Sequence, residues 1–297
     1  MIAAVCHDAG GAQIISSWLR RYKGDYCCIA EGPASNIFEQ KLGKQKSLGL
    51  IEAIESCEWV LCGSSWQSNL ERRAIRIAKA KKKKTVVFLD HWVCYKERFI
   101  ENGSSLLPDE IWVADRDALD IAKNLFSETK VLQKTNPYFE DIKNELVEIA
   151  AKKRKTTDNQ ILYVSEPISD QAMIDHKDPS YFGYTEQEAL TYFLQNIHVL
   201  GEKNPRIIIR PHPAELKNKY DWAIGESMYS ITIRNNSNLL EEIINSRLVV
   251  GCESMALVIA LTAGKRVICS IPDGPGKCGL PQSGIEFLRD LKSASNK

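Results

Sequence analysis

The chain has 297 residues, of which 44% are hydrophobic and 26% are charged, and its formal net charge is +1. This length and composition predict a globular protein with room for two domains of ordinary size, each with its own core. The near-neutral charge argues against a nucleic-acid partner, because duplex-binding proteins generally present a concentrated basic face. No apolar run approaches the roughly 20 residues of a membrane span, and the amino terminus enters a strand without a signal-peptide pattern, so we expect a cytoplasmic protein.

The first half of the chain alternates between strand and helix patterns, which predicts a parallel sheet with helices on both faces. Strands are expected at residues 2–6, 27–31, 59–62, 85–89 and 110–114, and another begins near residue 131. Helices are expected after the first strand to about residue 22, from 69 to about 80, and from 140 to 153. We therefore predict an N-terminal Rossmann-like domain at residues 1–151 and a linker at 152–159, where large apolar residues are absent.

The first strand runs directly into His7-Asp8, which is followed by the glycine pair Gly10-Gly11 at a helix start. Either side chain could serve as a catalytic base: His7 takes a proton while Asp8 orients it, or Asp8 takes the proton itself. The glycines allow close backbone approach, so the alternative is a simple phosphate-binding turn. We predict base chemistry at His7 and Asp8, with Gly10 and Gly11 beside an acceptor.

Two further strands of the first domain end in polar residues that could line an acceptor pocket. Ser65 and Trp66 follow one strand, and Asp90-His91-Trp92 follow another. In this interpretation Trp92 and Tyr95 stack on a sugar ring and Arg98 meets a carboxylate. The competing interpretation, weighed equally, is a buried ion pair between Asp90 and Arg98.

A lysine run, Lys79 with residues 81–84, lies between the expected helix and the following strand. Lysines at this position complement the helix dipole at its C-terminus, which is the favoured interpretation. The alternative is peripheral contact with the inner membrane surface or with a polyanionic acceptor, because clustered lysines are attracted to anionic lipids.

The second half restarts the alternating pattern and predicts a C-terminal Rossmann-like domain at residues 160–283. Strands are expected at 160–164, 207–209, 230–233, 248–250 and 265–269, with helices at 186–201, 239–245 and 255–261. Residues 168–184 are expected to form a loop shaped for binding, because they mix Asp, His, Pro, Gly and tyrosines. A closing helix at 284–291, within a terminal segment 284–297, is expected to pack back on the N-terminal domain.

One strand of this domain leads into an Arg210-Pro211-His212-Pro213 turn. Open α/β sheets bind ligands at the carboxyl ends of their strands, and the prolines stiffen the turn. Arg210 and His212 are therefore predicted to bind a phosphate, with Pro213 in the same site. Ser165 and Glu166, which follow the first strand of the domain, are similarly placed for nucleotide contacts.

A second ligand-binding signal is Gly251-Cys252-Glu253-Ser254, which joins a strand to a helix. Backbone amides and the positive end of the helix dipole make this position suitable for an anion, with Ser254 as N-cap or phosphate donor.

The nine cysteines include no Cys-x-x-Cys pair and no histidine at zinc-ligand spacing, so we expect reduced thiols. Most of these cysteines lie in apolar strands and are expected to pack there. Cys6 and Cys252 fall beside the predicted sites, but for them too packing is favoured over nucleophilic catalysis.

These two halves, with polar loops after the strands of the first and a histidine turn plus a helix-capping serine in the second, resemble the GT-B glycosyltransferases. His212-Pro213 and Glu253-Ser254 look like the His-Pro and serine motifs of bacterial sialyltransferases, polysialyltransferases and capsule-polymer transferases. The resemblance implies that residues 1–151 form an acceptor domain and residues 160–283 a nucleotide-sugar-binding domain. It also implies that these motifs hold the phosphate and ribose of a cytidine-nucleotide sugar and that Asp8 is the base. This chain departs from the family by an inserted Ala9 after Asp8 and by Met255 in place of a second serine.

We therefore predict two Rossmann-like domains facing across a cleft and a metal-independent, inverting glycosyltransferase. It would move a sugar, of the sialic-acid-like nonulosonic class, from a nucleotide-sugar donor to a glycan or lipid-linked acceptor. CMP-linked donors are favoured and UDP-linked donors are the alternative, and no resident cofactor or metal is expected. Alternative functions are a nucleotide-sugar epimerase or hydrolase of the same fold and a non-catalytic nucleotide-sugar-binding module.

Overall fold

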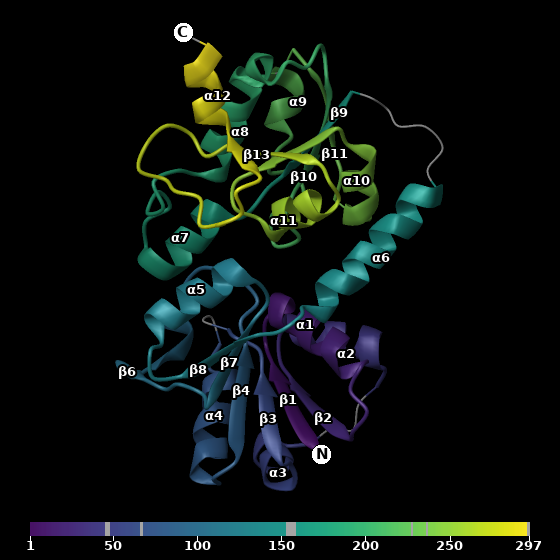
Figure 1. Ribbon diagram of the computed structural model, residues 1–297. Helices are drawn as coiled ribbons and strands as arrows, with labels where there is room; N and C mark the ends of the chain where they lie inside the picture. The colour runs from purple at the N-terminus through teal and green to yellow at the C-terminus, as the bar shows by residue number, and fades with distance from the viewer. Residues whose placement is uncertain (45–47, 66–67, 153–158, 227, 236, 296–297) are drawn as a thin grey trace. The chain divides into compact units, whose positions relative to one another are not determined.

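The computed structural model (Figure 1) describes residues 1–44, 48–65, 68–152, 159–226, 228–235 and 237–295. The chain forms two compact units, Met1–Asp141 and Ile142–Lys297, which we call unit 1 and unit 2. The division falls within helix α6 (Pro137–Lys152), whereas we predicted the first domain to end at residue 151. Most of the predicted linker, residues 153–158, lies outside the described residues.

Unit 1 is built on a parallel six-stranded sheet in the order β2-β1-β3-β4-β7-β8. The strands are β1 (Ile2–Cys6), β2 (Tyr26–Ala30), β3 (Trp59–Cys62), β4 (Lys84–Phe88), β7 (Glu110–Val113) and β8 (Lys130–Gln133). The helices around it are α1 (Ala9–Leu19), α2 (Pro33–Leu42), α3 (Leu50–Ser56), α4 (Leu70–Ala80), α5 (Arg116–Leu125) and the start of α6. The strand order changes direction between β1 and β3, and ligands of such sheets bind at that point.

A short 3₁₀ helix, η1 (Glu97–Phe99), and a hairpin of β5 (Ile100–Glu101) and β6 (Ser104–Ser105) extend the segment after β4. On one face of the sheet, Trp18 of α1 packs against Trp59 of β3 and Trp112 of β7, with ring centroids 6.0 and 5.9 Å away. This aromatic cluster fixes α1 on the sheet, and with it the loop from β1 that carries His7 and Asp8.

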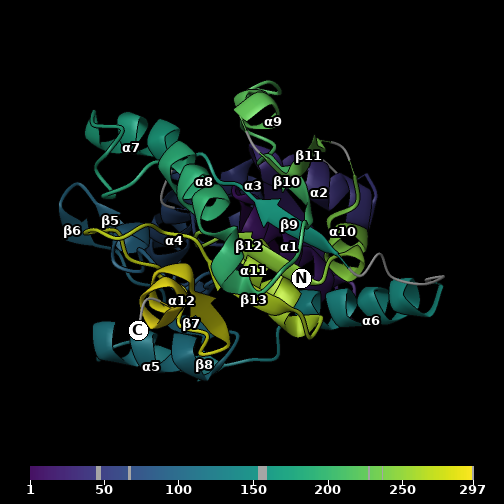
Figure 2. The same ribbon diagram turned by 90° about the horizontal axis from the view of Figure 1, so that it is seen from above.

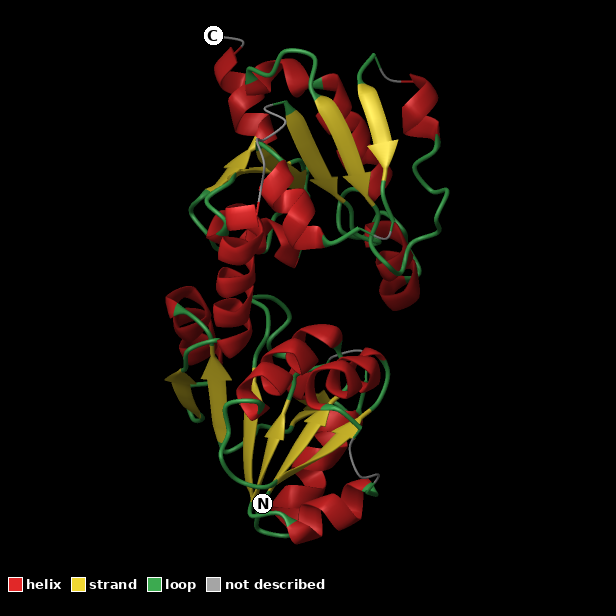
Figure 3. Ribbon diagram, turned by 90° about the vertical axis from the view of Figure 1, so that its right-hand side faces the viewer, coloured by secondary structure: helices red, strands yellow, loops and turns green. Residues whose placement is uncertain are grey.

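Unit 2 contains a second parallel six-stranded sheet, in the order β11-β10-β9-β12-β13-β14. Its strands are β9 (Gln160–Val164), β10 (Arg206–Arg210), β11 (Ser230–Ile233), β12 (Leu248–Gly251), β13 (Arg266–Cys269) and β14 (Ile285–Phe287). Figure 3 shows its strands as arrows with helices on both faces. The direction change here lies between β9 and β12, so the loops after these strands and after β10 are the expected ligand positions.

Helices cover both faces of the second sheet (Figure 2). One face packs against α8 (Glu186–Gln195), η2 (Ile197–Leu200), α9 (Trp222–Glu226) and α12 (Leu288–Ser295), whose buried side chains join alternate strand residues such as Tyr163, Ile207 and Val250. Helices α10 (Leu239–Asn245) and α11 (Met255–Thr262) contact the strands as well. Alternate strand residues such as Leu162 and Val249 are also fully buried, which is why these strands are apolar throughout.

The predicted fold class, two doubly wound parallel α/β domains, is confirmed, but several elements differ from prediction. Residues 168–184 were predicted to be a loop, yet they begin with helix α7 (Ile168–His176). The closing helix was predicted from residue 284, but residues 285–287 pair with β13 as strand β14 before α12 begins. Leu288 of α12 is completely buried in the core of unit 2.

Within the described residues, no helix is long and apolar enough to cross a membrane. In the lysine run, three of the five side chains bind groups of unit 1. Lys81 pairs with Glu55 at 2.6 Å, Lys83 donates to the Cys57 carbonyl at 2.7 Å, and Lys84 pairs with Glu110 at 2.9 Å. Three of these ammonium groups therefore already have partners within unit 1, which weakens the interpretation that the lysine run contacts a membrane.

Candidate functional site

The end of β1 in unit 1 brings together His7, Asp8 and Ser65. His7 Nδ1 lies 2.7 Å from Asp8 Oδ1, and the Ser65 hydroxyl donates to the same oxygen at 2.9 Å. Although Asp8 is the N-cap residue of α1, its side chain accepts no capping bond from the helix. A carboxylate oxygen accepts hydrogen bonds, so in the neutral imidazole this contact assigns the proton to Nδ1 and leaves Nε2 as a proton acceptor. An imidazole oriented by a carboxylate is a recurrent general-base arrangement.

Glu71, at the start of α4, supports the His7 backbone, and our sequence reasoning missed it. Its Oε1 accepts the His7 N–H at 2.8 Å, and Glu71 as a whole is only 3% exposed. Oε2 is buried and has no partner among the described residues. Burial raises the pKa of Glu71 to about 7. A glutamate in the first turn of a helix normally indicates only a favourable dipole interaction, so the sequence carried no signal of this contact.

Three glycines pack tightly around this loop. A Cβ on Gly10 would lie 2.0 Å from Asp90 Oδ2, and one on Gly11 would lie 3.2 Å from the Gly63 Cα. Gly32, at φ +55°, faces His7, and a Cβ there would lie 2.6 Å from Nε2. The close packing of α1 against the ends of β3 and β4 thus explains why positions 10 and 11 are glycines. Their role beside an acceptor stays a prediction.

The predicted acceptor pocket in the segment after β4 is a buried polar network instead. Arg98 Nη1 contacts Asp90 Oδ1 at 2.9 Å and Ser64 Oγ at 2.8 Å, and Arg98 is 7% exposed. The ion-pair interpretation therefore describes these residues. Trp92 is 7% exposed with Nε1 bonded to Asp115, and Tyr95 is 2% exposed. Both rings are buried and cannot stack on a sugar in this structure, so we correct that prediction. His91 is partly exposed with its Nδ1 buried, and Trp66 lies outside the described residues.

In unit 2, the histidine turn after β10 is held by a residue that we did not predict, Glu215. Its Oε2 accepts the His212 N–H at 2.8 Å, while Oε1 accepts the Tyr220 hydroxyl at 2.6 Å and pairs with Lys219 at 3.1 Å. The Glu215 side chain is completely buried. Charge-assisted bonds of this kind fix a turn more strongly than neutral ones. The sequence signal that could have indicated this contact was the glutamate three residues after His212.

The ring of His212 has a defined proton position. Nδ1 accepts the Ala214 N–H at 3.2 Å, so neutral His212 carries its proton on Nε2 and can donate it to a ligand. Desolvation of the ring lowers the pKa of His212, which favours this neutral form. His212 and Pro213 are both exposed, as a ligand-binding turn requires.

Two of the predicted nucleotide contacts are engaged within unit 2. Arg210 Nη1 pairs with Glu242 Oε2 at 2.7 Å and donates to the Ser237 carbonyl at 2.7 Å, and its predicted contact with a phosphate stays a prediction. Ser165 is 5% exposed and contacts the Tyr220 hydroxyl, so it belongs to the buried network beneath the histidine turn rather than to an accessible nucleotide site.

The loops after β9 and β12 place two carboxyl groups beside the start of α11. Glu166 Oε2 accepts the Glu253 N–H at 2.8 Å, and Glu253 Oε2 accepts the Gly279 N–H at 2.9 Å. Burial, together with the Glu253 carboxylate, raises the pKa of Glu166 to about 8, and burial also raises the pKa of Glu253. The predicted N-cap role of Ser254 is confirmed, since its Oγ accepts the Ala256 N–H at 3.3 Å. A protonated Glu166 can donate a hydrogen bond to an anion near the α11 N-terminus.

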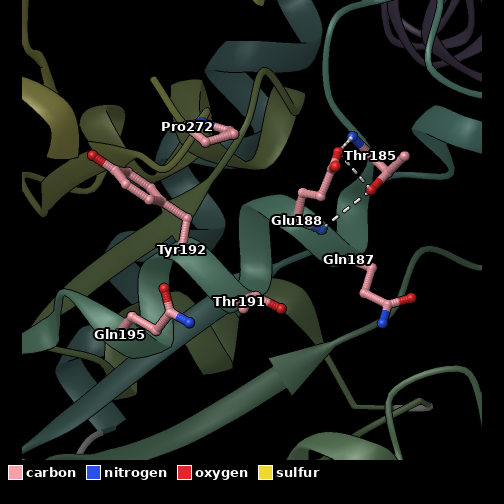
Figure 4. Close-up of a pocket in the computed structure, with 7 residues that line it drawn as sticks. All are labelled: Thr185, Gln187, Glu188, Thr191, Tyr192, Gln195 and Pro272. Carbon is pink, nitrogen blue, oxygen red and sulfur yellow. Dashed lines mark hydrogen bonds between the residues drawn. The ribbon is translucent and has the colours of Figure 1, made fainter. Parts of the chain in front are cut away.

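A pocket of about 500 Å³ lies on the outer side of α8 (Figure 4). Its lining residues are Thr185, Gln187, Glu188, Thr191, Tyr192, Gln195 and Pro272. Thr185 and Glu188 form the capping box of α8, drawn as dashed lines in the figure. None of the predicted site residues lines this pocket. Among the described residues, no group of three His, Cys, Asp or Glu side chains is arranged to hold a metal ion.

No protein-family model matches the sequence, and no curated protein matches it. Solved structures do match. A UDP-GlcNAc 2-epimerase from Methanocaldococcus jannaschii is 14% identical with a TM-score of 0.66, covering 100% of this chain and 92% of that chain. The Neisseria meningitidis UDP-GlcNAc 2-epimerase bound to UDP-GlcNAc is 12% identical with a TM-score of 0.62, covering 99% and 90%.

A Photobacterium phosphoreum α/β-galactoside α-2,3-sialyltransferase is 9% identical with a TM-score of 0.53, covering 98% of both chains. The chain has a GT-B-type fold. At these identities the likeness establishes the two-domain architecture and leaves the reaction to be argued from the site.

Proposed function

We propose that the chain is a GT-B-type enzyme that uses a nucleotide sugar, and that it transfers the sugar to an acceptor hydroxyl. The observation that carries the proposal is the His7–Asp8 contact of 2.7 Å, which leaves His7 Nε2 able to accept a proton. This proposal differs from the role that the resemblance implied for Asp8, because Asp8 becomes the group that orients the imidazole. The two assignments remain distinguishable by mutation.

In the proposed reaction, His7 Nε2 takes the proton of the acceptor hydroxyl as its oxygen attacks the anomeric carbon. The bond between that carbon and the phosphate oxygen breaks, and the nucleotide leaves with the electron pair. Unit 2 supplies the stabilising groups: the Nε2–H of His212 and the amides at the start of α11, with Ser254. Attack opposite the leaving group inverts the anomeric configuration.

For the donor, we retain a cytidine-linked sugar of the nonulosonic class, and for the acceptor a glycan or lipid-linked glycan. A uridine-linked donor is the alternative, and the similarity to an epimerase that binds UDP-GlcNAc supports it. Cytidine and uridine nucleotides differ in their bases, so nucleotide-binding measurements can distinguish the two donor classes. A thermal-shift panel of CMP, CDP, UDP, GDP and ADP should give stabilisation by one nucleotide that grows with concentration.

The first test compares wild type with His212→Ala and with His198→Ala, an exposed histidine of the same unit that serves as the matched control. Loss of nucleotide stabilisation in His212→Ala but not in His198→Ala supports the donor site. Equal responses of all three proteins would refute it. Binding without nucleotide release under any acceptor would favour a non-catalytic module.

The second test concerns the base. His7→Asn should abolish most turnover while nucleotide binding persists, whereas Asp8→Asn should leave a reduced rate, because His7 keeps its ring but loses the carboxylate that orients it. Equal binding but a larger loss in Asp8→Asn than in His7→Asn would return the base role to Asp8.

A second candidate function is epimerisation of the nucleotide sugar. The TM-scores of 0.66 and 0.62 to two epimerases, against 0.53 to the sialyltransferase, favour it. Epimerisation needs no acceptor and exchanges a carbon-bound hydrogen with solvent. Incubation of the donor in D₂O without acceptor separates the functions: deuterium in the recovered sugar indicates an epimerase, and nucleotide release only on addition of acceptor indicates a transferase.

A further inference from the structure

Two cysteine thiols meet at one end of the sheet in unit 2. Cys269 ends β13, and Cys278 lies in the irregular segment that leads to β14. Both sulfurs contact the same acceptor, the Cys252 carbonyl, at 3.2 Å for Cys269 and 3.5 Å for Cys278. Cysteines nine positions apart in sequence are thus brought to the same carbonyl oxygen.

The two thiols have different exposure. Cys269 is completely buried, whereas Cys278 is partly exposed. The neighbouring Cys269 thiol lowers the pKa of Cys278, which increases its thiolate fraction. An accessible thiolate next to a second thiol is the arrangement found at reversible redox cysteines, where the first attacks the oxidant and the second resolves the product.

We propose that Cys269 and Cys278 form a reversible disulfide when the protein meets a peroxide. The Cys278 thiolate attacks one peroxide oxygen, the O–O bond breaks, and a sulfenic acid forms with release of water. The Cys269 sulfur then attacks the Cys278 sulfur, forming the S–S bond and releasing a second water. The two thiols together lose two electrons, which reduce one molecule of hydrogen peroxide, and a dithiol reductant reverses the step.

Cross-linking acts on the loop that holds Glu253. Gly279, the neighbour of Cys278, donates its N–H to Glu253 Oε2 at 2.9 Å, and Ser254 caps α11 immediately after Glu253. An S–S bond is about 2.05 Å long, so its formation draws residue 278 toward β13. The segment between the cysteines contains no helix or strand and can adjust to this shift. We expect the Glu253–Gly279 contact to change on oxidation. A resulting change in nucleotide affinity rests on the proposed function, but the cross-link does not.

The test treats the full-length protein with hydrogen peroxide under non-reducing conditions, then unfolds it, alkylates it and maps its peptides by mass spectrometry. We expect two fewer of the nine cysteines to be alkylated and a peptide pair joined through 269 and 278, with full recovery after dithiothreitol. Cys278→Ser should abolish this pair. Cys94→Ser, which removes an exposed cysteine of unit 1, is the matched control and should leave the pair unchanged.

A pair joined through Cys252 instead, or sulfinic acid at Cys278 without a cross-link, would overturn the proposal. Amide exchange provides a second readout that needs no ligand: oxidation should change protection at Gly279 in wild type and not in Cys278→Ser. Unchanged exchange in a protein that carries the mapped disulfide would overturn the predicted effect on the Glu253 loop. Neither readout depends on whether the enzyme binds a nucleotide sugar.

Discussion

Replacing Arg210 with methionine tests whether this arginine holds unit 2 together or binds a phosphate. Arg210 is the ionic partner of Glu242, whose side chain is only 2% exposed, and it donates to the Ser237 carbonyl as well. Removing one member of a buried ion pair costs about 3–5 kcal/mol because a charge is left without its partner. Arg210 itself is 20% exposed, so solvent can relieve part of the cost, and we expect about 3 kcal/mol.

A loss of about 3 kcal/mol corresponds to a fall in Tm of roughly 6–12 °C for a unit of this size. Adding Glu242→Gln to Arg210→Met should restore part of the loss, because a neutral amide carries no uncompensated charge. Thermal and urea unfolding of both single variants and the double variant give the coupling energy, which we expect at about 1–2 kcal/mol. Unchanged stability in Arg210→Met, together with lost nucleotide binding, would refute the structural role and return Arg210 to the phosphate.

Three further outcomes follow from contacts in the two units. Burial raises the pKa of Glu71 from 4.5 to about 7, so the folded unit retains a proton that the unfolded chain releases. Stability should therefore fall by about 3 kcal/mol as pH rises from 4.5 to 7, and Glu71→Gln should flatten this part of the pH–stability profile; matching profiles would contradict the assignment. Gly10→Ala should cost about 1–3 kcal/mol in thermal unfolding through its clash with Asp90. Gly49→Ala, where a Cβ meets nothing within 4 Å, should cost much less, and equal losses would argue against the clash. His212→Ala should weaken nucleotide affinity about 10- to 100-fold in calorimetry, while His212→Gln, which keeps a side-chain N–H, should lose less.

The sequence predicted several regular elements well where apolar residues recur at strand or helix spacing. Residues 2–6, 59–62, 160–164, 230–233 and 239–245 have the bounds that the structure gives them. Failures came where local composition misled. The mix of Asp, His, Pro, Gly and tyrosines in residues 168–184 suggested a loop, but Ile168 and Ala172 lie about one helical turn apart and are both buried. The short strand at residues 285–287 is defined by its pairing with β13, which no local pattern reveals.

Within the candidate site, sequence reasoning identified the strand ends but not which side chains they leave available. Arg210 was assigned to a phosphate from its position at a strand end, and its contact with Glu242, 32 residues away on another element, was not predicted. Trp92 and Tyr95 suggested a sugar platform, yet both pack inside unit 1. Glu71 and Glu215 were missed because acidic residues are common near helix starts and turns, and only the fold shows that each accepts a backbone N–H from a candidate histidine.

The buried carboxylate of Glu215 also limits how the His212 turn can be re-engineered. Through Lys219 it is joined to Glu186 at the start of α8, and through Tyr220 to Ser165 beyond β9. A transplanted turn that carries only Arg210 to Pro213 would leave these partners behind and lose its conformation. A turn transferred to another protein should therefore include Glu215, Lys219 and Tyr220. The receiving protein should also supply side chains equivalent to Glu186 and Ser165. Libraries intended to change donor preference should randomise the exposed neighbours of His212 and keep this anchor fixed.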